Sequence, residues 1–324
     1  MKSSKKAFIL LEAALAVMVF MTVTGMFLEK SREERGKVSV IVLNSESSRW
    51  SAFKYGLRMA AEDRNVEMLV VSTGENMSAK EEYEAVLQEI ENGADAVIVQ
   101  PVPEESTESL FQKADNKIPM IFIEDPMAAD IIGSAPPTVQ PDNYVLGQAL
   151  GEELLKDYGG NLSSKKLGVL AEYGNSEAAL KRKEGLLSVL KGKGVQVRWD
   201  LSDFSREEEE TILRDQSKVD LVLALDDSSL VLAGKTALAN NLHGALVYGI
   251  GNSMDAVYCL DTGYVQCLLV PDDFNMGYQS LCEAAKVLGH TLKKPESQTV
   301  SYTMMRRDTL FSKENQEILF TMSQ

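Results

Sequence analysis

Cysteine is scarce in this sequence. Cys259, Cys267 and Cys282 are the only three among 324 residues, and no two of them form a C-x-x-C motif. Because an odd number leaves one thiol unpaired in any scheme, the sequence argues against a disulfide framework, and the count does not settle the redox compartment. Cys267 alternates with Val265 and Leu269, which is typical of a small core residue on a strand.

Histidine and the common catalytic motifs are also scarce. His243 and His290 are the two histidines, and each stands next to a glycine near a predicted helix end, where structural roles predominate. The sequence has no G-x-S-x-G or H-E-x-x-H motif and no spacing typical of metal ligands. The phosphate-binding patterns G-x-G-x-x-G and G-x-x-x-x-G-K-[ST] are missing too. We therefore predict a protein that is not an enzyme and has neither a cofactor nor a metal.

Positive charge is outweighed by negative charge. The chain has 33 lysines and arginines against 48 aspartates and glutamates, for a net charge of −15. Nucleic-acid recognition depends on basic side chains that neutralise phosphates, so this balance argues against a nucleic-acid partner. The acidity is best interpreted as a source of solubility.

One long apolar run stands at the N-terminus. Residues 7–28 carry a single charge, Glu12, and three lysines precede them. A helix of this length would span about 33 Å, enough for a bilayer core. A cleaved signal peptide is the alternative, with a poor candidate site around Gly25. We predict an uncleaved anchor with a cytoplasmic tip and an exported body, because lysines stay on the cytoplasmic side.

From Lys37 onward, apolar runs of strand length alternate with amphipathic helical patterns, several of which end at glycine. This alternation predicts βαβ units and a parallel sheet covered by helices on both faces. The predicted strands are 38–43, 66–72, 96–100, 118–124, 166–171, 195–201, 219–225, 245–250 and 265–270. Nine strands are too many for one doubly wound unit, and an irregular stretch follows Asp125. We therefore predict two similar α/β lobes in tandem.

A polar loop follows the first strand. Residues 44–48 are small, polar or acidic, and Arg49 and Trp50 come directly after them. Ligands of open α/β sheets bind outside the carboxyl ends of the strands, so this loop is either one wall of a binding cleft or a plain turn.

In order and spacing, several segments resemble the type I periplasmic binding proteins of the ribose-binding class, whose fold the lactose-repressor-type regulators share. They are "VIVLNSESSRWSAFKYGLRMAAE", "ENGADAVIVQPV", "IPMIFIED", "VQPDNYVLGQALGEEL", "RKEGLLSVL", "VDLVLALDDSSLVLAGKTAL" and "LVYGIGNSMDAVYCLDTGYVQCLLVPDDFNMG". The resemblance covers residues 37–312. It implies two doubly wound parallel-sheet lobes joined by a hinge, with crossovers near Asp125 and Pro271. Residues 1–36 would be the tip, anchor and linker. Residues 37–124 plus 272–301 would form the N-terminal lobe, and 125–271 plus 302–324 the C-terminal lobe and tail.

The resemblance also implies a ligand between the lobes, clamped by aromatic faces and by side chains that bond to its hydroxyl groups. The positions of this sequence that would line the cleft are Ser47, Arg49, Trp50, Asp125, Asp226 and Asn252. Three positions depart from the family. Leu180 stands where a sugar-clamping arginine is common, Gly251 where an aspartate binds hydroxyls, and Pro271 where a glutamine is frequent. An ordinary sugar would lose those polar contacts.

Each of these residues also has a structural interpretation. Trp50 shares a helical face with Phe53 and Leu57, which is equally compatible with a place in the core. Asp226 and Asp227 could belong to the cap of the following helix, with Asp227 or Ser228 as its N-cap, and Asn252 or Ser253 could cap the helix after that. Arg49 could pair internally with Asp125, and the run from Lys181 to Lys183 is most often a solvated face.

The leading functional hypothesis is a membrane-tethered extracytoplasmic protein that closes two lobes around a small polar, sugar-like solute for an ABC-type importer. In this hypothesis Trp50 stacks on a neutral ligand. The alternative is a ligand-sensing accessory protein that docks on a membrane sensor kinase.

Overall fold

The computed structural model describes residue 15 and residues 17–22, 36–74, 76–104, 106–111, 118–126, 136–202, 209–288 and 294–324. The chain divides into two units, Met1–Gly36 and Lys37–Gln324. Within the predicted anchor at 7–28, Leu15 and residues 17–22 are helical, and the remainder lies outside the described residues. Over the part of the chain that is described, no helix has both the length and the hydropathy needed to span a bilayer.

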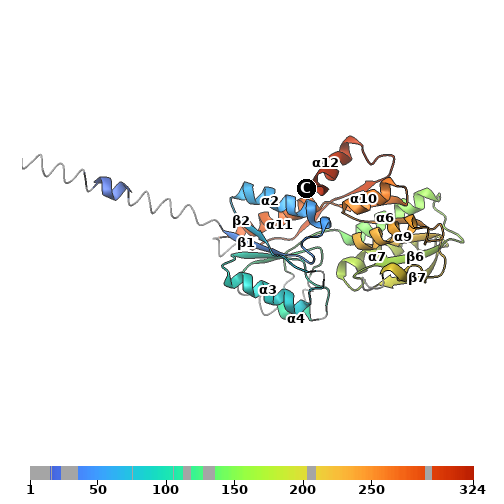
Figure 1. Cartoon of the computed structure of the whole chain (residues 1–324), viewed down its shortest axis with the longest axis horizontal. Helices are drawn as coiled ribbons and strands as arrows, with labels where there is room; N and C mark the ends of the chain where they lie inside the picture. The colour runs from blue at the N-terminus through green and yellow to red at the C-terminus, as the bar shows by residue number, and fades with distance from the viewer. Residues whose placement is uncertain are drawn as a thin grey trace, which may run out of the picture. The chain divides into compact units, whose positions relative to one another are not determined.

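The second unit contains two six-stranded sheets, one in each lobe (Figure 1). In the first lobe the strands run β11-β5-β4-β3-β1-β2, and all five pairs are parallel. Strands β3 and β4 are buried at every position, as expected where helices cover both faces. The bounds are β1 Lys37–Ile41, β2 Glu67–Val70, β3 Ala96–Val99, β4 Met120–Ile123, β5 Thr138–Pro141 and β11 Gln298–Val300.

In the described part of the first lobe, four helices cover the sheet. Helices α2 (Ser51–Arg64) and α11 (Asp273–Val287) pack on one face, and α3 (Ala79–Glu91) and α4 (Thr107–Phe111) pack on the other (Figure 1). Successive strand residues point to opposite faces, so Val40 belongs to the first of these cores and Ile41 to the second.

The second lobe has the strand order β12-β10-β9-β8-β6-β7, in which only β12 is antiparallel to its neighbour. Helices α6 (Asn143–Asp157) and α7 (Glu177–Leu190) cover one face. The other face carries α9 (Asp227–Leu238), α10 (Met254–Asp261), the short α8 (Glu209–Ile212) and α12 (Lys313–Met322). The strands are β6 Lys166–Ala171, β7 Gln196–Ser202, β8 Leu221–Ala224, β9 Leu246–Ile250, β10 Val265–Pro271 and β12 Tyr302–Met305.

Both lobes contain a helix crossing with a glycine on each helix. A Cβ atom on Gly147 of α6 would lie 1.9 Å from the Arg182 carbonyl oxygen, and one on Gly185 of α7 would lie 2.0 Å from the Tyr144 carbonyl oxygen. In the first lobe, Gly56 and Gly277 bring α2 and α11 equally close. These glycines let the helix backbones touch, and in the second lobe they set the position of Arg182.

The chain passes between the lobes three times. It leaves the first sheet after β5 for α6, returns from β10 to α11, and leaves again from β11 to β12. Two of these crossovers are bonded to each other, because the Asp272 amide donates to the Ser301 carbonyl at 2.9 Å and the Ser301 hydroxyl to the Asp272 carboxylate at 3.2 Å. Together the three segments form the hinge.

The structure confirms the predicted fold class, and all nine predicted strands are present. It corrects the lobe boundary at residue 125. Strand β5 pairs with β4 and β11 in the first sheet, so the first crossover follows Pro141 rather than Asp125. Residues 138–141 were missed as a strand because TVQP follows two prolines and ends in a third, a pattern typical of a loop. Pro271 does stand at a crossover.

Candidate functional site

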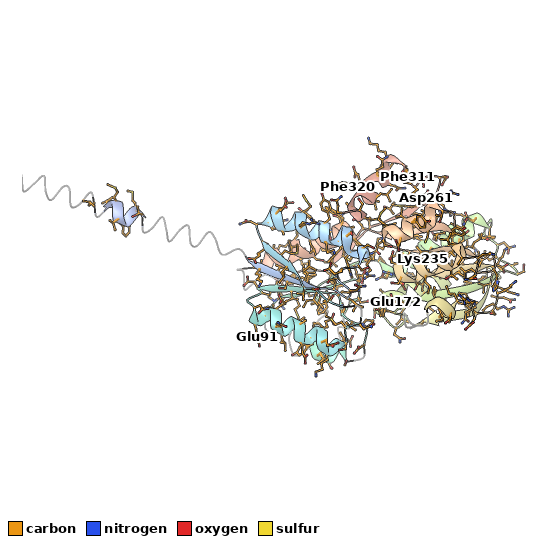
Figure 2. The ribbon with its side chains drawn as sticks, viewed as in Figure 1. Glu91, Glu172, Lys235, Asp261, Phe311 and Phe320 are labelled. Atoms are coloured by element: carbon orange, nitrogen blue, oxygen red, sulfur yellow. The ribbon has the colours of Figure 1, made fainter. Side chains whose placement is uncertain are left out.

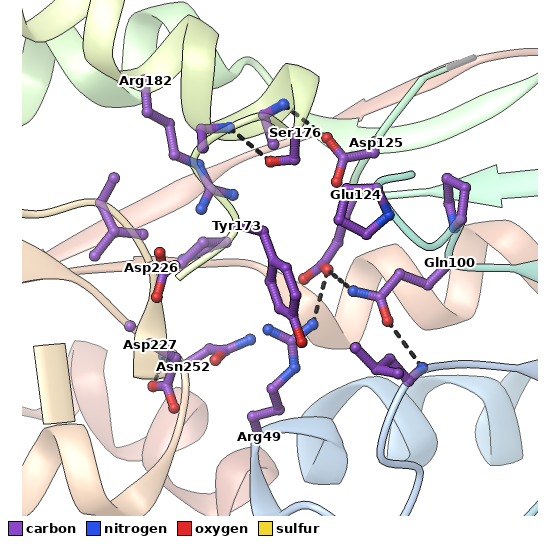
Figure 3. A pocket seen from close by; sticks show the side chains of 18 residues that line it. Arg49, Gln100, Glu124, Asp125, Tyr173, Ser176, Arg182, Asp226, Asp227 and Asn252 are labelled. Atoms are coloured by element: carbon purple, nitrogen blue, oxygen red, sulfur yellow. Dashed lines mark hydrogen bonds and ion pairs between the residues drawn. The ribbon is translucent and has the colours of Figure 1, made fainter. Parts of the chain in front are cut away.

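The carboxyl ends of strands from both sheets meet at a small pocket, which we call the cleft pocket (Figure 3). Leu43, Gln100 and Glu124 line it from the first lobe, and Tyr173 and Asp226 from the second. It encloses about 60 Å³, room for roughly two water molecules.

Arg49 lies at the centre of the first-lobe wall. It follows β1 on the 3₁₀ turn η1 (Ser48–Trp50), and its Nη2 donates to Glu124 Oε2 at 2.8 Å. Gln100 Nε2 donates to the same oxygen at 2.7 Å, while Gln100 Oε1 accepts from the Leu43 amide at 3.0 Å. The ends of β1, β3 and β4 are therefore joined by one network that holds the guanidinium in place.

Glu124 has an unusual backbone conformation. Its φ angle is +63°, in the left-handed region that non-glycine residues rarely adopt. Such strain persists where the surroundings impose it, and it is concentrated at binding and catalytic sites. Here the strained residue supplies the carboxylate that bonds to both Arg49 and Gln100.

The surroundings of Arg49 keep it charged. Burial lowers the pKa of its guanidinium, but the carboxylates of Glu124, Asp227 and Asp273 more than compensate and raise the pKa above its usual range. The cation is therefore a permanent feature of the pocket.

Arg182 supplies a second cation from the opposite lobe. This α7 residue is only 8% exposed, and its Nε donates to Asn143 Oδ1 at 2.8 Å. Its Nη1 donates to the Leu225 carbonyl, also at 2.8 Å. Tyr173, which follows β6, extends into the pocket between Arg182 and Arg49 (Figure 3). It is the aromatic residue of the cleft pocket.

Three aspartates on the pocket wall accept hydrogen bonds from backbone amides. Asp125 accepts from the Ala178 amide at 2.7 Å, and Asp226 accepts from the amides of Ser229 and Glu172 at 2.8 and 2.9 Å. Asp227 accepts from the amides of residues 252 and 253. Burial raises the pKa of Asp125 to about 6, with a contribution from Glu124, and burial also raises the pKa of Asp227.

Asn252, which lines the cleft pocket, is in contact with Asp273 behind it. Asn252 Nδ2 donates to the Asp273 carboxylate, and both side chains are buried. Burial and the nearby Glu124 raise the pKa of Asp273 to about 8. Among the described residues, the Oδ1 atom of Asn252 finds no hydrogen-bond partner.

Four of the six residues expected in the cleft meet around this pocket: Arg49, Asp125, Asp226 and Asn252. Ser47 lines a neighbouring hollow together with Asn44 and Asp227. Asp226 is the N-cap of α9, one residue before the first position, Asp227, at which the capping interpretation expected it.

Two expectations about the opening loop are wrong. Trp50 is 0% exposed, lies in the core between β1 and α2, and donates from Nε1 to the Leu43 carbonyl at 2.9 Å. It cannot stack on a ligand, because its helical face is the face that packs on the sheet. The partner of Arg49 is Glu124 rather than Asp125, since Asp125 turns toward α7 instead.

Of the three residues that depart from the family pattern, two line the cleft pocket and one does not. Leu180 is 51% exposed and is not part of the cleft wall, whereas Gly251 and Pro271 do line the pocket. Arg182, interpreted from sequence as part of a solvated face, is buried in the wall.

Gln100, Glu124 and Tyr173 were not singled out from sequence. The first two stand directly after β3 and the end of β4, so the rule that ligands meet strand ends could have found them.

Comparison with known families shows which family the chain belongs to. Residues 38–291 match the family model described as periplasmic binding protein domain. The chain belongs to that family. Membership confirms the resemblance seen in the sequence and agrees with the prediction that the protein is not an enzyme. A search of curated proteins found no match.

Solved structures of the same fold include several binding proteins. A carbohydrate transporter solute-binding protein from Agrobacterium radiobacter, in complex with D-arabinose, has a TM-score of 0.76 at 15% identity and covers 88% of this chain and 99% of its own. A glucose-galactose binding protein from Geobacillus stearothermophilus has a TM-score of 0.73 at 17% identity, with 86% and 100% covered. A XylFII–LytSN complex has a TM-score of 0.70 at 17% identity, with 85% and 98% covered.

Proposed function

We propose that the protein is an extracytoplasmic solute-binding protein that takes a small, neutral, sugar-like ligand into the cleft pocket for an ABC-type importer. The observation that carries this proposal is the composition of the pocket wall. Two fixed cations, Arg49 and Arg182, and one aromatic ring, Tyr173, line the cleft pocket from the two lobes. Similar structures are named as a carbohydrate transporter solute-binding protein and as a glucose-galactose binding protein.

A neutral ligand suits the charges of the wall. Arg49 is paired with Glu124, and the aspartates accept hydrogen bonds from backbone amides. Because Arg49 and these aspartates already have partners, an ionic ligand that bound to them would have to displace one. Sugar hydroxyls both donate and accept, so they can bond to these groups without breaking the ion pair.

The pocket must enlarge to admit a sugar. Its volume of about 60 Å³ is smaller than any monosaccharide. The hinge between the lobes is the element that can open it, by rotation about the three crossovers.

We also propose that residues 7–28 anchor the body to the cell membrane with the body outside. The length of the apolar run and the lysines before it support this orientation. Intact-mass measurement of the protein from membranes should find the run retained. A mature chain that begins near Gly25 or later would exclude the anchor.

The binding proposal is tested by calorimetry on the full chain in mild detergent, with D-arabinose, D-galactose, D-glucuronate and D-glucosamine. We expect a neutral sugar to bind and Arg49→Gln to weaken it about tenfold or more, because a hydrogen bond to a charged group contributes about 1.5–3 kcal/mol. Arg58→Gln, on the exposed side of α2, is the matched control and should bind normally. Failure of both neutral sugars, or equal affinity in Arg49→Gln, would reject the proposal.

A second candidate function is that of a sensing subunit that docks on a membrane protein such as a sensor kinase. It is favoured by the similarity to a protein that was solved in a XylFII–LytSN complex. The adjacent genes distinguish the two: permease and ATPase genes indicate import, and a sensor kinase with a response regulator indicates signalling.

A further inference from the structure

A larger pocket lies at the hinge, and we call it the hinge pocket. It encloses about 310 Å³, several times the volume of the cleft pocket. Its wall comes from the end of β10, the first turn of α11, strand β12 and helix α12, with Ala52 of α2. It is therefore built from two of the three crossovers, β10–α11 and β11–β12, together with the C-terminal helix.

The wall of the hinge pocket is rich in acceptors. Asp272, Asp273 and Glu317 are its ionisable residues, and no lysine or arginine is among the residues placed on it. An apolar part of the wall comes from Phe274, Ile318 and Met322. A ligand that suits this wall combines a cationic donor group with an apolar body.

One buried acceptor on this wall has no donor. Asn252 lines both the hinge pocket and the cleft pocket, and it is 7% exposed. Its Nδ2 is used by Asp273, while its Oδ1 has no hydrogen-bond partner among the described residues. A buried carbonyl oxygen without a donor is unfavourable, so a ligand that supplies an N–H group to this atom would be stabilised by the new hydrogen bond.

We propose that the hinge pocket is a second ligand site, which binds a small organic ammonium ion. An ammonium group has three N–H donors and no acceptor, which matches Asn252 Oδ1 and the carboxylates of Asp273 and Glu317. Its apolar part packs on Phe274, Ile318 and Met322. The proposal holds whatever ligand the cleft pocket binds.

Because of its location, a ligand in the hinge pocket would affect ligand binding in the cleft pocket. A ligand in the hinge pocket contacts residues 270–273 and Thr303, which belong to two of the three crossovers, and Asn252, which also lines the cleft pocket. Its occupancy therefore favours one arrangement of the lobes, and by reciprocity a cleft ligand changes its affinity by the same factor.

The test uses 2-phenylethylammonium as the probe, with 2-phenylethanol and 3-phenylpropionate as neutral and anionic counterparts. Binding to the full chain in mild detergent is measured by saturation-transfer NMR and by calorimetry. We expect the ammonium compound to bind at least tenfold more tightly than the alcohol, and the carboxylate not to bind. Equal binding of the ammonium compound and the alcohol would overturn the proposal.

Two variants locate the binding. Glu317→Gln should weaken the ammonium compound severalfold, whereas Glu314→Gln, one turn earlier on the exposed side of α12, should not. Thr321→Trp places a large ring in the pocket and should abolish binding. Since Glu317 is exposed, its substitution leaves folding intact, and unchanged affinity in both Glu317→Gln and Thr321→Trp would show that the probe binds elsewhere.

The pH dependence gives a third readout. Asp273 faces Arg49, Glu124, Asp227 and Asn252, and burial with the nearby Glu124 raises its pKa to about 8. Because the ammonium ion favours the ionised carboxylate, its affinity should rise between pH 7 and pH 9. Asp273→Asn should remove this rise, and a rise that persists in that variant would exclude Asp273 from the site.

Discussion

The guanidinium carbon of Arg49 lies 4.1 Å from the centre of the Trp50 ring. The ring is buried, so it presents its face to the cation rather than to the cleft, and Glu124 bonds to the same guanidinium from another direction. A cation over an indole face gains about 0.5–2 kcal/mol. Trp50 therefore acts on the cleft through Arg49, by fixing the position of a charge that faces the pocket.

Trp50→Phe tests this arrangement. The change leaves the partly buried Leu43 carbonyl without its donor and creates a void in the core, so we expect the free energy of unfolding to fall by about 2–4 kcal/mol. Urea denaturation followed by circular dichroism measures it. The exposed Phe311, on the C-terminal segment in Figure 2, is the control, and Phe311→Ala should change stability by less than about 0.5 kcal/mol. A Trp50→Phe protein as stable as the wild type would mean that the indole is not part of the core.

Gly185→Ala tests how α7 positions Arg182. The added Cβ would lie 2.0 Å from the Tyr144 carbonyl oxygen, so α7 must move away from α6 and take Arg182 with it. We expect a loss of about 1–3 kcal/mol in stability together with weaker sugar binding. Thermal unfolding and calorimetry measure the two effects. Gly74→Ala is the control, because nothing lies within 4 Å of a Cβ at that position. Normal sugar affinity in a destabilised Gly185→Ala protein would separate Arg182 from the ligand.

Glu82→Gln tests the cost of a buried carboxyl group. Glu82 is 1% exposed and accepts from the Val102 amide, and burial raises its pKa from 4.5 to about 8. A carboxyl group whose pKa is higher in the folded state holds its proton there after the unfolded chain has released it. Its contribution to stability is therefore complete below pH 4.5 and is lost as the pH rises toward 8.

We thus expect Glu82→Gln to gain stability relative to the wild type by up to about 1.4 kcal/mol for each pH unit within that window. Urea denaturation at a series of pH values measures the difference. Glu91→Gln, on the exposed end of α3 seen in Figure 2, should follow the wild-type curve. A Glu82→Gln protein whose curve runs parallel to the wild type would show that Glu82 keeps an ordinary pKa in the fold.

The fold was largely predictable because its signals are local. Continuous apolar runs of four to seven residues, such as those of β3 and β8, read as buried parallel strands, and amphipathic patterns between them read as the covering helices. The parts that were missed, β5, β11 and β12, are short strands of three or four residues. Their assignment depends on partners far away in sequence, so no local pattern marks them.

The sequence by itself determined the α/β class, the two lobes and the place of Arg49 just after the first strand, because strand length, strand-end position and residue type can all be read along the chain. Only the tertiary structure decided that Trp50 belongs to the core, that Glu124 is the partner of Arg49, and that Arg182 reaches the cleft while Leu180 points to solvent. The physical reason is rotation about the element axis. Along a helix, residues two apart such as Leu180 and Arg182 point in directions that differ by about 200°. Which face of α7 is buried is decided by the helix that packs against it. That helix is α6, which contacts α7 through Gly147 and Gly185.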